Sequence, residues 1–157
     1  MKLFRSMAVA ILLASVVAAS EEAKISKFDS AEYIKLSSNG ENKKSATRIG
    51  GTLSFNNDKK TIEFLDQKEA PEFSIKYDNI KSMLYERTST PRYVAAILVS
   101  PFFLFSHSKK HYLTIQYTDD AGAGQFVSIH LDKKNAREVV ATAEASTGKK
   151  VDREEEK

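Results

Sequence analysis

Five short runs of alternating apolar and polar residues constrain the fold of this chain more than any other feature of its sequence. An apolar residue at every second position places one side of a strand against a core and the other side in water. Turn-forming residues separate the runs, so the pattern predicts an antiparallel sheet. The runs lie at 52–55, 61–64, 73–77, 112–117 and 126–131, and weaker strand patterns at 33–37 and 81–87 bring the expected total to about seven.

Two of the intervening segments have the composition of hairpin turns. Residues 56–60 read NNDKK, and Asn and Asp tolerate left-handed backbone angles. Residues 118–125 read TDDAGAGQ, in which Gly122 and Gly124 supply positive φ angles without steric cost. We therefore expect each segment to join its flanking strands into a hairpin.

The apolar period changes from two to that of a helix near the end of the chain. Asp132 is placed to cap a first turn, and Gly148 is placed to end the helix in the left-handed conformation. The spacing predicts one helix at residues 133–147. Its apolar face consists of Ala136, Val139, Val140, Ala143 and Thr147.

The first twenty residues have the pattern of a secretory signal peptide. Lys2 and Arg5 form a positive head, residues 7–17 form an apolar run, and small residues follow. Cleavage after Ser20 fits the small-x-small rule, and cleavage after Ala19 is the alternative. The pattern predicts export to the bacterial periplasm or the outside, and an uncleaved membrane anchor is the other interpretation of the same run.

Composition excludes several functional classes. The chain has no Cys, so a disulfide framework, a Cys-based metal site and a Cys nucleophile are ruled out. Its net charge of +3 falls to +1 without residues 1–20, which argues against a nucleic-acid partner. No familiar catalytic motif is present, so we expect neither an enzyme nor a cofactor. His107 and His111 flank two lysines that oppose a metal ion, and His130 is expected to be an exposed imidazole on the polar face of its strand.

A second apolar segment, VAAILVSPFFLF at residues 94–105, is flanked by basic residues on both sides. This pattern is typical of a segment that docks on an anionic lipid surface or on another protein, and it is too short to span a bilayer. The alternative is packing within its own domain, as a short helix before Pro101 and a strand after it. The residues expected to contact a membrane or partner are Arg92, Val94, Ile97, Leu98, Phe102, Phe103, Leu104, Phe105, Lys109 and Lys110.

A longer pattern resembles bacterial PH-like domains related to the GRAM group, and it covers about residues 48–150. It consists of FSIKYDNIKSMLYE at 73–86, with a tight step at Asp78, then KKHYLTIQY at 109–117, a glycine hairpin and the final helix. The resemblance implies a mainly β (α+β) fold, a partly open seven-stranded antiparallel barrel with a C-terminal capping α-helix. Phosphoinositide-binding members use basic residues of their first loop, but an exported bacterial protein does not normally meet such lipids, so no binding residue is carried over.

These observations together predict a secreted, non-enzymatic interaction module that docks on a membrane surface or an envelope protein through residues 94–105. The alternative is a carrier or sensor of a small apolar ligand, and neither interpretation predicts an oligomeric state or a metal. The expected organisation is a signal peptide at 1–20, a lead-in segment at 21–30, a barrel domain at 31–148 and a charged flexible tail at 149–157.

Overall fold

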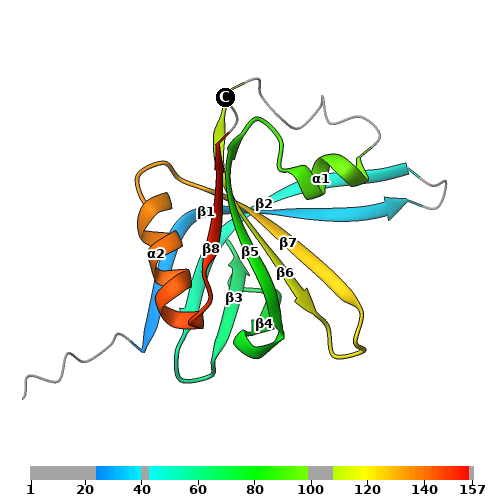
Figure 1. Ribbon diagram of the computed structural model, residues 1–157. Helices are drawn as coiled ribbons and strands as arrows, with labels where there is room; N and C mark the ends of the chain where they lie inside the picture. The colour runs from blue at the N-terminus through cyan, green and yellow to red at the C-terminus, as the bar shows by residue number, and fades with distance from the viewer. Residues whose placement is uncertain (1–23, 40–42, 99–107, 156–157) are drawn as a thin grey trace, which may run out of the picture.

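The computed structural model of this chain describes residues 24–39, 43–98 and 108–155, and these form a mainly β domain (Figure 1). Eight strands and two α-helices are present in this part of the chain. The strands are β1 (Ile25–Asn39), β2 (Lys43–Asn56), β3 (Thr61–Asp66), β4 (Pro71–Lys76), β5 (Ile80–Thr88), β6 (Lys110–Thr118), β7 (Gly124–Leu131) and β8 (Val151–Glu155). The helices are α1 (Arg92–Ile97) and α2 (Ala136–Thr147), and a 3₁₀ turn, η1 (Tyr77–Asn79), precedes β5.

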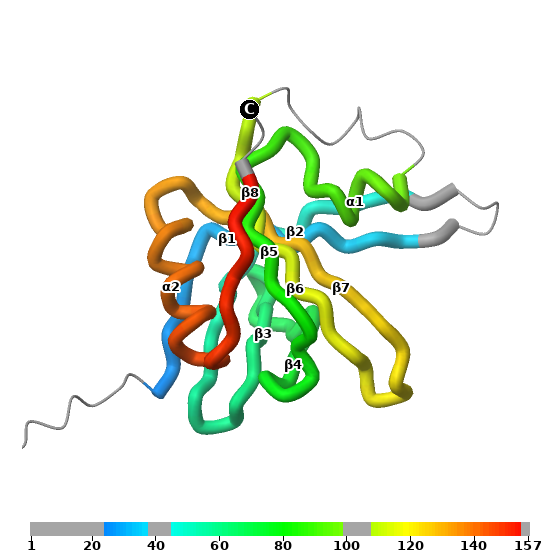
Figure 2. Tube along the Cα trace, viewed as in Figure 1, coloured from blue at the N-terminus to red at the C-terminus, as the bar shows by residue number. Residues whose placement is uncertain are grey.

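All eight strands belong to one strongly bent sheet, in the order β4-β3-β2-β1-β7-β6-β5-β8. Neighbouring strands run antiparallel except β5 and β8, which are parallel. Only three residue pairs join β1 to β7, from Glu32–His130 to Ile34–Ser128. Beyond these pairs the β1–β2 hairpin and the β6–β7 hairpin diverge, as both ribbon and tube show (Figures 1 and 2).

The main core lies between the two halves of the bent sheet and under α2. Phe55, Phe64 and Ile115 are fully buried at its centre. The four apolar residues predicted for the inner face of the helix are also buried there, so the expected packing of α2 is confirmed. They are Ala136, Val139, Val140 and Ala143.

Both predicted hairpins are present, and their turn residues act as their chemistry suggests. The side-chain oxygen of Asn56 accepts hydrogen bonds from the backbone N–H groups of Asp58 and Lys59, at 3.1 and 3.0 Å. Gly122 takes φ = 83° in the second turn. Gly51 has a different role, because a Cβ there would lie 2.0 Å from the carbonyl oxygen of Leu65 on β3.

The structure corrects the prediction at both ends of the domain. β1 begins at Ile25 rather than near residue 31, because its backbone pairs with the end of β2. The predicted flexible tail contains an eighth strand, in which Val151 is completely buried and pairs with Met83 on β5. Charged residues surround Val151 in sequence, so only the tertiary contact explains this strand.

The terminal helix starts three residues later than the predicted residue 133. Asp132 accepts hydrogen bonds from the backbone N–H groups of Lys134 through its carboxylate and of Ala136 through its carbonyl. It therefore caps a turn that leads into α2. Gly148 ends the helix with φ = 67°, as expected.

Candidate functional site

The short helix α1 lies on the outer face of the sheet and is anchored there by apolar contacts. Val94 is fully buried and Leu98 is 8% exposed, and both belong to a second apolar cluster with Ile34, Ala46 and Tyr112. This burial favours the alternative of a short helix packed in its own domain over contact of Val94 and Leu98 with an external partner. Ile97 is half-buried.

The remaining predicted contact residues divide into two groups. Lys109 is exposed and Lys110 is half-buried at the start of β6. The last four apolar residues of the predicted docking segment lie outside the described part of the chain, as does His107. These four are Phe102, Phe103, Leu104 and Phe105.

Arg92 ties the start of α1 to two neighbouring strands. Its guanidinium forms ion pairs with Glu86 on β5, at 3.5 Å, and with Glu154 on β8. Glu86 is 5% exposed, and burial raises the pKa of its carboxyl group, while the nearby guanidinium partly offsets that effect. Arg92 therefore links α1 to β5 and β8 through ion pairs, in addition to being an exposed cation.

A groove opens on one side of α1, where β1 and β7 diverge. We call it the notch, and its volume is about 380 Å³. Beyond Ile34 on β1 and before Ser128 on β7, the two facing strand edges pair with no other strand in the described part of the chain. The notch is lined by Tyr33, Ile34, Leu36, Ser37, Glu72, Phe73, Ile97, Tyr117, Gln125, Phe126 and Val127.

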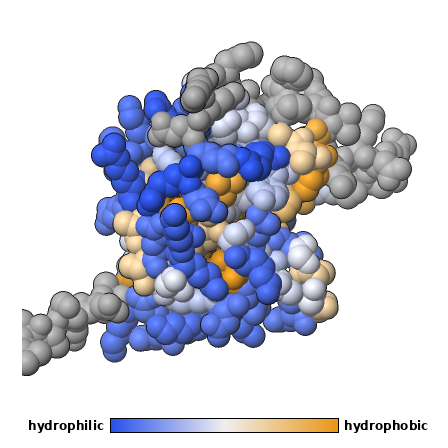
Figure 3. Space-filling model, viewed as in Figure 1, coloured by the Kyte–Doolittle hydropathy of each residue, from blue (hydrophilic) through white to orange (hydrophobic). Residues whose placement is uncertain are grey.

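Four of the eleven residues that line the notch are aromatic, and the lining carries little net charge. The Tyr33 and Phe73 rings meet edge to face at 5.1 Å, and burial raises the pKa of both Tyr33 and Tyr117, which keeps both phenols neutral. Glu72 is the charged residue of the lining, and Lys35 pairs with it at 2.8 Å. Apolar surface is also visible over α1 in Figure 3.

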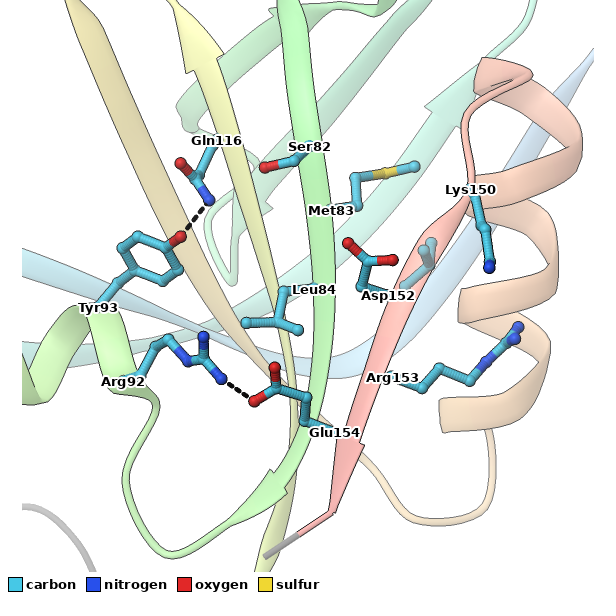
Figure 4. A pocket seen from close by; sticks show the side chains of 11 residues that line it. Ser82, Met83, Leu84, Arg92, Tyr93, Gln116, Lys150, Asp152, Arg153 and Glu154 are labelled. Carbon is cyan, nitrogen blue, oxygen red and sulfur yellow. Dashed lines mark hydrogen bonds and ion pairs between the residues drawn. The ribbon is translucent and has the colours of Figure 1, made fainter.

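A second groove, with a volume of about 530 Å³, opens on the other side of α1 (Figure 4). We call it the polar groove. Its floor comes from β5 and β6, and its walls come from the start of α1 and from β8. The side chains that line it are Ser82, Met83, Leu84, Arg92, Tyr93, Gln116, Lys150, Val151, Asp152, Arg153 and Glu154.

A polar cluster that the sequence analysis missed crosses the outer face of the sheet beside α1. His130 is half-buried rather than exposed, and its Nδ1 lies 2.8 Å from a carboxylate oxygen of Glu32. Arg48 lies 3.4 Å from the same oxygen, and the Tyr112 ring packs against the imidazole at 5.5 Å. Burial raises the pKa of Tyr112 to about 12. No local spacing links these residues, which come from four strands, so only the strand register brings them together.

The described residues show neither a metal cluster nor a membrane-spanning helix. No group of three or more His, Asp or Glu side chains is placed to hold a metal ion in residues 24–39, 43–98 and 108–155. His111 instead hydrogen-bonds with the hydroxyl of Tyr85 through its Nδ1. Neither α1 nor α2 is long and apolar enough to cross a membrane.

Comparisons with known proteins bear on the fold. No protein-family model matches the chain, and no curated protein matches its sequence. Among solved structures, a chain of the Spt16D–Pob3N heterodimer matches with a TM-score of 0.50 and 10% identity, over 86% of this chain and 57% of that chain. The hSac2 domain from the human phosphoinositide phosphatase Sac2 matches with a TM-score of 0.42 and 10% identity, over 87% of this chain and 80% of that chain.

The likeness to the Spt16D–Pob3N chain supports the class of fold. This chain aligns with little more than half of the Spt16D–Pob3N chain. The matched Spt16D–Pob3N chain is PH-like, and the present sheet with its terminal helix is a PH-like β fold. The predicted mainly β, mostly antiparallel fold with a C-terminal helix is thus confirmed. The structure has an open sheet of eight strands where a seven-stranded barrel was expected. At this level of identity the likeness concerns the fold alone.

Proposed function

We propose that this protein is an exported, non-enzymatic interaction module that binds an extended apolar segment of an envelope protein in the notch. The observation that carries the proposal is the divergence of β1 from β7 after three residue pairs. It leaves a groove between two strand edges, and four of the residues that line this groove are aromatic. The signal-like residues 1–20 support export.

The chemistry of the notch favours a polypeptide over a lipid tail. Unpaired strand edges present backbone N–H and C=O groups, and an added strand satisfies them while its alternate side chains enter apolar pockets. A lipid tail can fill the apolar lining but offers no hydrogen-bonding partner. Because Lys35 neutralises Glu72 at the rim, an uncharged segment fits better than a strongly charged one.

Membrane docking through residues 94–105 has less support from the described geometry. Val94 and Leu98 contact the protein's own core, so they are not available to lipid while α1 stays in place. A carrier of a small apolar ligand is the alternative that uses the same notch. The following experiment therefore separates the three functions.

Ile97 offers a sharp test because it lines the notch without being a core residue. Random peptides displayed on phage are selected on the purified protein, and the selected peptides are then measured against two variants. Ile97→Asp places a carboxylate in the notch wall and should weaken binding at least tenfold. Ala95→Asp places the same charge on the exposed side of the same helix and should leave binding unchanged.

Two other results would replace the proposal. If no peptide is enriched and the protein binds anionic vesicles, a membrane surface is the partner. If no peptide is enriched and a fluorescent fatty acid binds in a manner sensitive to Ile97→Asp, the notch is a carrier site. Peptide binding that is equally strong in the parent and in Ile97→Asp places the interaction surface elsewhere.

A further inference from the structure

The polar groove has a chemistry different from that of the notch, and the proposed function does not use it. Figure 4 shows Leu84 near its centre, with Tyr93 and Gln116 on one side and Asp152 on the other. In the strand register, Gln116 lies opposite Ser82, and Asp152 lies opposite Leu84. A small apolar surface is thus surrounded by hydrogen-bonding side chains from four elements.

The charges around the groove are largely compensated within the protein. Arg92 pairs with Glu154, and Arg153 pairs with Glu144 on α2 at 2.9 Å. A polyanion would meet the carboxylates of Asp152 and Glu154, and a polycation would meet Arg92 and Lys150. This balance of positive and negative charges favours a neutral ligand. Because few of the side chains that line the groove are apolar, a ligand rich in hydroxyl groups fits best.

Tyr93 and Gln116 form a matched pair of hydrogen-bonding groups. The Gln116 amide N–H donates to the Tyr93 hydroxyl oxygen. This bond leaves the amide oxygen as an acceptor beside the phenol O–H as a donor. Two adjacent hydroxyl groups on a ring present the complementary donor and acceptor. Tyr93 is also held in place, because its ring packs against Phe126 at 5.5 Å.

We propose that the polar groove binds a neutral oligosaccharide. Leu84 is 7% exposed, and one sugar ring lies over this small apolar surface. Vicinal hydroxyl groups pair with Gln116 and Tyr93, and a further hydroxyl donates to Asp152. The 530 Å³ groove is open to solvent rather than enclosed, so it admits an internal unit of a chain as well as an end. This inference is independent of the notch and of its partner.

The test is an NMR titration of the purified, ¹⁵N-labelled protein with maltotriose and with cellotriose. We expect the amides of Ser82, Gln116 and Asp152 to shift and to saturate with a Kd of about 1 mM for at least one sugar, as befits a shallow, open site. The double variant Gln116→Ala, Asp152→Ala should weaken binding at least tenfold. Glu138→Ala, on the exposed side of α2, is the matched control and should leave it unchanged.

Tyr93→Phe removes only the hydroxyl and keeps the ring contact, so it tests the hydrogen bond in a protein that stays folded. It should weaken binding several-fold with an unchanged melting temperature. The proposal would be overturned if these amides did not shift at a sugar concentration ten times the expected Kd. Equal affinity of the protein for glycerol would also overturn it. Stronger binding of inositol hexakisphosphate or spermidine at these amides would also overturn it, because the ligand class would then be charged. Ile97→Asp should leave sugar binding unchanged. A failure of the sugar-binding proposal can therefore be distinguished from a failure of the proposed peptide binding in the notch.

Discussion

Glu32 and His130, 98 residues apart in sequence, hold the sheet together at its narrowest point. The Nδ1–H of His130 donates to a carboxylate oxygen of Glu32 at 2.8 Å. The same two residues form one of the three backbone pairs between β1 and β7. This side-chain bond therefore reinforces the short ladder that joins the two halves of the sheet. The notch opens at the other end of that ladder, beyond the pair of Ile34 and Ser128.

The position of His130 predicts a loss of stability in mild acid. Burial lowers its pKa below the ordinary 6.5, and Lys110 and Arg48 act in the same direction, while Glu32 opposes them. The unfolded chain therefore takes up this proton more readily than the folded protein. The contribution of His130 to the free energy of unfolding is fully present above pH 6.5. It falls as the pH drops toward the lowered pKa, by at most about 1.4 kcal/mol per pH unit.

Urea unfolding of the parent and of His130→Gln between pH 5 and 8 checks this prediction. Glutamine keeps an N–H donor for Glu32 but does not titrate. The stability difference between the two proteins should therefore change with pH below 6.5 and stay constant above it. A constant difference over the whole range would show that His130 titrates alike in the folded and unfolded protein.

Leu98→Asp should destabilise the domain by several kcal/mol, because it buries a carboxylate in the apolar cluster under α1. Ala96→Asp, on the exposed side of the same helix, should change the melting temperature little. Thermal unfolding followed by circular dichroism gives both values. Equal melting temperatures would mean that Leu98 is not part of the core, and membrane docking through residues 94–105 would regain support.

Removal of residues 149–157 should lower stability, because it deletes β8 and exposes the edge of β5. Val151→Asp should have a comparable effect, since Val151 is completely buried and full burial of such a side chain contributes about 1.5 to 3 kcal/mol. The neighbouring Asp152→Ala should leave the melting temperature unchanged, because Asp152 is exposed. If Val151→Asp has the same melting temperature as the parent, residues 149–157 are the solvated tail that their composition suggests.

The exported protein should begin at Glu21 or Ser20. Intact-mass measurement on protein recovered from the periplasm or the medium of expressing bacteria checks this prediction. A mass that retains the first twenty residues would identify that segment as an anchor.

Local sequence determined the hairpins and the terminal helix of this protein. Alternation over five runs, the Asn56 turn, the glycine turn at Gly122 and the 3.6-residue period before Gly148 each depend on residues close in the chain. Because such signals report which face of an element is apolar, they also predicted the packing of α2. The expectation of a PH-like fold came from the resemblance of residues 48–150 to PH-like domains.

Tertiary structure alone decided the eighth strand, the burial of Val94 and Leu98, and the candidate sites. Val151 lies in a charged segment, and its strand exists because its backbone pairs with β5 and its side chain enters the core. The notch depends on where β1 and β7 stop pairing, and the Glu32–His130 bond depends on their register. Such pairings join residues far apart in sequence, such as Met83 with Val151 and Glu32 with His130, and their free energy comes from contacts that no local pattern encodes.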